Sequence, residues 1–202
     1  RSLIGKLVDG QPAPPDLEFT ALAGALASDG RQHRLTGLSL GAPFGQLGAD
    51  LELDGRRPFP LKATARLATR QADQAWAVQA RASGDLENLK LDATASGAGM
   101  DGTAAIMATP FAPLPLKSAV LKLVGLDPSR LGAAAPRAVL DIDATLEPSA
   151  APGVGKPEAA DWIVSGPLRI VNHQPGSYDS GALPLESLAA SVRWAGGELA
   201  LS

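Results

Sequence analysis

The sequence contains no cysteine, which excludes disulfide bonds, thiolate metal sites and cysteine nucleophiles. Aromatic residues make up only 4% of the 202 residues although hydrophobic residues make up 45%, so Ala, Leu and Val must supply most of any core. Basic residues are not in excess: the formal net charge is −3 and no concentrated basic stretch is present. The composition therefore argues against nucleic-acid binding, which needs a basic face.

Long hydrophobic runs are also missing. No apolar run reaches the ~18 residues that a membrane helix requires, and RSLIGKLVDG at the start lacks the apolar centre of a signal peptide. Strand-like patterning continues to both ends of the chain, and ELALS at 198–202 is similar to half a strand. We therefore expect 1–202 to be a single segment of a longer repetitive protein.

Helix-forming patterns are scarce. GLDPSRLG at 125–132 predicts one short helical turn, with Asp127 as its cap and Pro128 at its first position. The segment 17–26 fits either a strand or a short helix. The Pro-, Gly- and Ala-rich stretch 148–160 predicts a mobile loop.

Most of the remaining chain alternates apolar and polar residues. The alternation is strict in 47–53, 61–67, 76–82, 89–95 and 140–146. An antiparallel sheet with one solvated face has this pattern, whereas a buried parallel sheet has unbroken apolar runs. We expect about ten to eleven strands in an all-β meander, with a tight hairpin at Asp54 and Gly55 and another turn at Asp101 and Gly102.

The longest β-unit spans 162–194. Two alternating arms, 162–170 and 188–194, flank a centre rich in Pro, Gly, Ser and Asp that is too long for a tight hairpin. The two tryptophans at its ends, Trp162 and Trp194, are expected either to anchor the core where strand ends meet or to line the apolar face.

A wide sheet with one apolar face must bury that face. It can close as a barrel, split into a sandwich, or curl into a trough that a ligand fills. Small inward residues, among them Ala65, Ala80 and Ala93, leave space that favours the trough, although strands rich in alanine can also pack closely in a sandwich. The sequence thus predicts an all-β fold, a long curled antiparallel sheet with an apolar inner groove, and leaves the sandwich as an alternative.

A repeated motif points to a family. RRPFPL at 56–61 recurs as PFAPLPL at 110–116, and each copy is followed by an alternating strand, which indicates a repeated supersecondary unit. With GLDPSRL and the stretch WIVSGPLRIVNHQPGSYDSGALPLESLAASVRWAGGELAL, this order resembles the TamB proteins of Gram-negative bacteria, within the AsmA-like group. The resemblance covers the whole chain.

The resemblance implies a β-taco, a long curled sheet with a hydrophobic groove that spans the periplasm as part of an inner-membrane-anchored protein. It implies a conduit that moves phospholipid between the inner and outer membranes without catalysis or cofactor, and a TamA-like outer-membrane barrel protein as partner of the full-length chain. Acyl chains lying along the groove would gain ~0.8 kcal/mol per buried methylene.

The expected lipid-groove residues are the larger apolar residues of the inward face. They are Leu51, Leu53, Leu61, Leu67, Trp76, Val78, Leu89, Leu91, Ile106, Leu121, Leu123, Leu140, Ile142, Leu146, Trp162, Val164, Leu168, Ile170, Leu188, Val192 and Trp194. A different class of function, a structural module that assists assembly of outer-membrane proteins through edge-strand pairing, remains the alternative. Open edges also predict that the segment can form a dimer.

Candidates for enzyme chemistry are few. His33 and His173 lie in polar, turn-like surroundings, where a hydrogen-bonding role is the simpler interpretation. Asp141 and Asp143 share a strand face and could hold a cation, although a solvated face explains them as well. Ser177, Asp179 and His173 have the residue types of a hydrolase triad but lack a nucleophile elbow. We expect neither a catalytic site nor a metal site.

Overall fold

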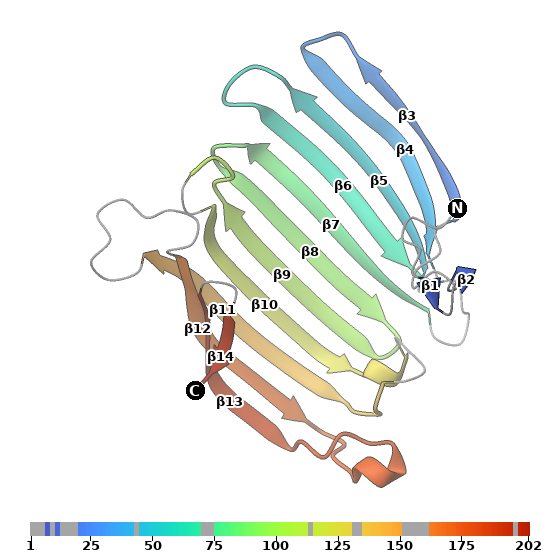
Figure 1. The fold of residues 1–202 in the computed structure, drawn as a ribbon, viewed down its shortest axis with the longest axis vertical. Helices are drawn as coiled ribbons and strands as arrows, with labels where there is room; N and C mark the ends of the chain where they lie inside the picture. Colours follow the sequence, from blue (N-terminus) through green and yellow to red (C-terminus); the bar gives the residue numbers. More distant parts are fainter. Residues whose placement is uncertain are drawn as a thin grey trace.

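The computed structural model describes residues 7–8, 11–12, 20–42, 45–69, 75–112, 115–130, 135–150, 162–195 and 198–202. Twelve strands form one antiparallel sheet in which the spatial order follows the sequence, from β3 at one edge to β14 at the other (Figure 1). Two very short strands, β1 (Leu7–Val8) and β2 (Gln11–Pro12), pair only with each other. The predicted all-β antiparallel fold is confirmed.

The strands of the main sheet are mostly 9 to 11 residues long. They are β3 (Thr20–Ser28), β4 (Gln32–Ala42), β5 (Gly45–Asp54), β6 (Pro60–Ala68), β7 (Trp76–Asp85), β8 (Leu89–Gly97), β9 (Met100–Ala108), β10 (Leu116–Leu126), β11 (Leu140–Ala150), β12 (Trp162–Asn172), β13 (Ser187–Ala195) and the four-residue β14 (Glu198–Leu201). The segment that fitted either a strand or a helix forms β3.

The sheet has a single layer. Extensive packing joins each described strand to its neighbours in the sheet, and no described helix or second sheet covers either face. The two edge strands do not pair with each other, so the barrel and sandwich solutions are excluded for the described part of the chain. The whole chain exposes 13,169 Å², about 1.5 times the ~8,900 Å² expected of a compact protein of 20.6 kDa.

Two turns differ from their sequence predictions. The β5–β6 connection is not a tight hairpin at Asp54 and Gly55: it takes in 55–59, and the Asp54 carboxylate accepts a hydrogen bond of 2.9 Å from the Arg56 amide. The β8–β9 turn lies at Ala98 and Gly99, both with positive φ, whereas Asp101 and Gly102 belong to β9. Asx and Gly residues tolerate turns, but the pairing of the flanking strands decides which of them turn.

The predicted helical turn is confirmed as a 3₁₀ turn, η2 (Pro128–Arg130). The Asp127 carboxylate caps it, accepting bonds from the Ser129 amide at 3.1 Å and the Ser129 hydroxyl at 2.7 Å. A second 3₁₀ turn, η4 (Tyr178–Ser180), lies in the long β12–β13 connection. In both places the described chain forms one short turn and no longer helix.

The loop was predicted to begin at residue 148, but residues 148–150 belong to a strand. Strand β11 continues through Ala150, because residues 148–150 pair with 162–164 at the start of β12. The rest of the predicted loop lies outside the described residues.

The two copies of the PF motif meet in space. The rings of Phe59, before β6, and Phe111, before β10, pack edge to face with centroids 5.4 Å apart and an interplanar angle of 74°. The β7–β8 turn lies at the same end of the sheet, and its Leu86 amide donates to the Pro58 carbonyl at 3.1 Å. Repeated loops thus brace one end of the sheet.

Candidate functional site

Strand register places the apolar alternation on one side of the whole sheet. Residues paired across an antiparallel ladder share a face, and the apolar partners recur from strand to strand: Leu51 with Ala63, Leu91 with Ile106, and Leu168 with Ala190. We call this surface the apolar face. Its extent is on the order of 1,600 Å², taking twelve strands at ~4.8 Å spacing and ~30 Å length, which is well above the few hundred Å² usual on a monomer.

Nineteen of the 21 expected groove residues occupy the apolar face by register; the side chains of the other two, Trp162 and Trp194, lie outside the description. Most of these nineteen are half-buried. Trp76, Leu140 and Val164 are buried, and Leu121 is 38% exposed. These nineteen residues therefore lie on one surface, and away from the loops at its end the described chain covers them only with neighbouring side chains.

A row of alanines crosses the centre of this face. Ala49, Ala65, Ala80, Ala93 and Ala104 are paired one to the next from β5 to β9. Larger side chains lie on either side of the row, with Leu47, Leu67 and Val78 in one neighbouring row and Leu51, Leu91 and Ile106 in the other. The row runs across the strands for ~19 Å. The two neighbouring rows mix these larger side chains with smaller residues, Ala63, Ala82, Ala95 and Gly102.

One end of the apolar face is capped by its loops. The β10–β11 and β12–β13 connections lie at the same end of the sheet, coloured yellow and orange in Figure 1. Most of the buried apolar side chains that the structure describes belong to this end; they are Trp76, Met100, Ala138, Leu140 and Ala182. The remaining one, Val164, lies at the opposite end of β12.

Asn172 ties this capped end together and is the buried polar residue of the described chain, at 5% exposure. Its Oδ1 accepts hydrogen bonds from the amides of Val139 at 3.1 Å and Gln174 at 3.0 Å. Its Nδ2 donates to the carbonyls of Leu183 at 3.2 Å and Leu185 at 2.9 Å. The sequence predicted Asn172 only as one of the turn residues between the two arms of 162–194, whereas the structure places it at the end of β12 with these four partners.

The opposite face is mostly polar and carries exposed ion pairs, one between β4 and β5 and one within β8. Met107, Val120 and Val124 also lie on this face and are exposed. Arg34 and Glu52 lie 3.0 Å apart, and Lys90 and Asp92 lie 2.9 Å apart. Because all four side chains are largely exposed, each pair contributes no more than about 1 kcal/mol. The charged side chains of this face can stay in contact with water, so they need no covering layer.

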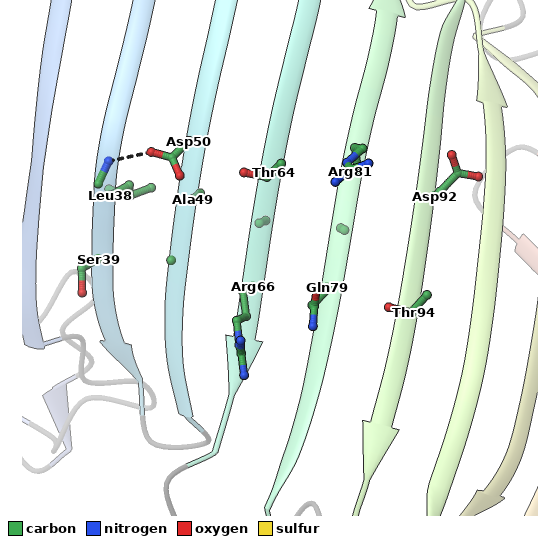
Figure 2. Close-up of a pocket in the computed structure, with 14 residues that line it drawn as sticks. Leu38, Ser39, Ala49, Asp50, Thr64, Arg66, Gln79, Arg81, Asp92 and Thr94 are labelled. Carbon is green, nitrogen blue, oxygen red and sulfur yellow. Dashed lines mark hydrogen bonds between the residues drawn. The ribbon is translucent and has the colours of Figure 1, made fainter.

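A hollow of about 710 Å³ lies on the polar face over β4 to β8 (Figure 2). Arg66 and Arg81 line it with Asp50 and Asp92, so its charges of the two signs balance. Gly48 pairs with Arg66 and has no side chain, so it leaves space for the hollow beside Arg66. Smaller hollows of about 250, 380 and 230 Å³ lie on the same face. The alternation of apolar and polar residues did not predict these polar hollows.

The residues considered for catalysis make structural contacts. The His173 ring bonds the Asp141 carboxylate at 2.7 Å, and no contact of the described chain joins it to Ser177. The Gly125 amide, at 2.9 Å, and the His173 ring hold the pKa of Asp141 below its usual value. His33 bonds the Ser28 hydroxyl at 2.9 Å across the β3–β4 turn.

Within the described residues, no group of three or more His, Asp or Glu side chains could hold a metal ion. No helix in the described part of the chain is long and apolar enough to cross a membrane.

Comparison with protein-family models, with curated proteins and with solved structures finds no match to this chain. The resemblance to TamB proteins therefore stays a prediction.

Proposed function

We propose that this chain is a non-enzymatic conduit that holds phospholipid acyl chains against its apolar face. The observation that carries the proposal is the single-layered sheet, whose apolar face continues from β3 to β13 and, away from the end that the loops cap, is covered by no described element. Exposed apolar surface of this extent marks a binding surface. A mobile apolar ligand fits such a face because it needs contact area and no specific polar partner.

Acyl chains match the face in chemistry and in length. The hydrocarbon core of a bilayer is ~30 Å thick, so each acyl chain covers ~15 Å, and the alanine row crosses ~19 Å. The described apolar face offers the chain Leu, Ile, Val and Ala contacts, which favour apolar ligands without selecting a particular lipid. Low selectivity is what a bulk phospholipid conduit requires.

Location and partner belong to the same proposal. The chain would work in the periplasm, as part of an inner-membrane-anchored TamB-like protein, with a TamA-like outer-membrane barrel protein as its partner. The support for this is the resemblance of the motifs quoted above, and fractionation of the full-length protein between inner membrane and periplasm tests it.

The decisive experiment is lipid extraction and mass spectrometry on the natively purified chain, beside a sample washed with detergent and then mixed with phospholipid vesicles. We expect near-stoichiometric phospholipid. Leu91→Asp and Ile142→Asp, which place a charge on the apolar face, should lose most of it. Thr94→Asp and Thr145→Asp place the same charge on the polar face of the same two strands and should keep it. A folded wild-type chain without lipid, or equal occupancy in both pairs of variants, overturns the proposal.

Ala80→Leu is a test that adds bulk without charge. On an open face the added side chain meets no covering layer, so stability should hold, whereas overpacking a closed core costs about 1–3 kcal/mol. The leucine would interrupt the alanine row and lower lipid occupancy. If lipid occupancy is unchanged, the acyl chain does not lie along the alanine row.

A second candidate function is assembly of outer-membrane proteins through edge pairing. The observation that favours it is β3, which is the edge strand of the described sheet and has nine exposed residues. Capture of unfolded outer-membrane strands by wild-type chain, but not by an edge variant, would support it.

A further inference from the structure

The edge strand β3 lacks most of the devices that keep sheet edges apart. Natural edges are usually short or carry charges or proline, whereas β3 has nine residues, TALAGALAS, without either. All nine are exposed, with Leu22 at 73% and Leu26 at 77%. Two register shifts against β4 are present, one between Thr20 and Ala23 and one between Ala23 and Ala25. The extra residue of the second shift lies in β4, so the alternation within β3 continues from 22 to 28.

The central seven residues of β3 have the same sequence in both directions. From Ala21 to Ala27 it is A-L-A-G-A-L-A, centred on Gly24. An antiparallel pairing of two copies about this centre sets Leu22 opposite Leu26 of the partner subunit, twice, by symmetry. A self-complementary patch is the requirement of a two-fold interface.

The two leucines and Gly24 lie on the apolar face. Leu26 pairs with Leu35, which pairs with Leu51. A Cβ at Gly24 would approach Leu38, and Leu22 shares this face because it lies two residues before Gly24. A two-fold axis perpendicular to the sheet keeps like faces on the same side. Pairing through β3 therefore joins two apolar faces into one.

We propose that β3 binds a second copy of this chain, by antiparallel pairing centred on Gly24, to form a continuous sheet of twenty-four strands. The occupant is a second copy because the strand is uncharged, complementary to itself, and flanked on both copies by the same apolar face. This inference does not depend on lipid binding, although the joined face would double the surface proposed above.

Charge exchange at the paired positions tests the register. Light scattering should give the wild type a mass twice 20.6 kDa. Leu22→Lys/Leu26→Lys and Leu22→Glu/Leu26→Glu set like charges opposite each other, so each alone should be monomeric. Their equimolar mixture should recover the doubled mass, and so should Leu22→Lys/Leu26→Glu, in which each Lys faces a Glu. Both side chains are exposed, so circular dichroism should show all variants folded.

Three results would overturn the inference. They are a monomeric wild type, like-charge variants that keep the doubled mass, and a mixture that stays monomeric. A monomeric wild type that captures an added alternating peptide would mean that the edge takes a foreign strand. Lipid content measured on the like-charge variants separates the two proposals, because these variants keep Leu91, Ile142 and the alanine row.

Discussion

Removal of the Asn172 side chain should weaken the capped end of the sheet. The side chain makes four hydrogen bonds to backbone groups, and three of its partners, Val139, Leu183 and Leu185, are half-buried. A hydrogen bond contributes about 1 kcal/mol net, and a half-buried group left unpaired costs at least as much. Asn172→Ala should therefore cost about 3 kcal/mol. For a chain of this size that loss lowers Tm by about 6–12 °C.

Thermal and urea unfolding, followed by circular dichroism, measure this loss. The matched control is Asn88→Ala, because the Asn88 side chain is exposed and accepts a single bond from Lys117 at 2.9 Å. That control should change stability by no more than about 0.5 kcal/mol. Equal effects at the two asparagines would refute the reasoning.

Asn172→Asp adds a pH test. The carboxylate keeps the acceptor role toward Val139 and Gln174 but faces the carbonyl oxygens of Leu183 and Leu185 with no proton to donate. These carbonyls raise the pKa of the new carboxyl when the chain is folded. The variant should therefore lose stability at neutral pH and recover part of it as the pH falls and the carboxyl is protonated. Wild-type stability at neutral pH would contradict the assigned bonds.

Three further predictions concern stability and use urea unfolding as the measurement. Leu140→Ala, at a buried position, should cost about 2–4 kcal/mol, and Leu121→Ala, at a position 38% exposed, should cost less. Gly97→Ala should lower the free energy of unfolding more than Gly30→Ala. Both glycines have positive φ, but a Cβ at Gly97 would collide with the backbone of residue 75, whereas a Cβ at Gly30 meets nothing within 4 Å. The pKa of the Asp141 carboxyl is lower in the folded chain than in the unfolded chain, so its hydrogen bonds stabilise the fold above about pH 4 and are lost as the pH falls. Asp141→Asn should therefore make the stability of the chain less sensitive to acid.

The direction of each strand side chain was predictable from the sequence. The parity of a position within a strand decides its face, and parity is local. Leu51, Leu91 and Ile142 could therefore be assigned to one face before any pairing was known, and the register confirms them. The cap at Asp127 was predictable for the same reason, because the groups that it bonds lie two residues away.

Turns were less predictable, because a turn has to satisfy the two strands that it joins. The pair Asp54 and Gly55 favours a tight hairpin by itself, but Leu53 pairs with Leu61, which leaves a longer connection. Ala98 turns at positive φ although alanine does not favour it, because Gly97 pairs with Met100 across that turn.

The sequence by itself determined a strand-rich chain with one apolar side, because alternation needs only near neighbours. The tertiary structure alone decided the rest. Pairing between residues far apart in sequence aligned Ala49 to Ala104 in one row, brought Phe59 against Phe111, and gave Asn172 its partners. It also left the sheet without a second layer, because consecutive strands continued to pair side by side and the described chain supplies nothing else that could cover the apolar face.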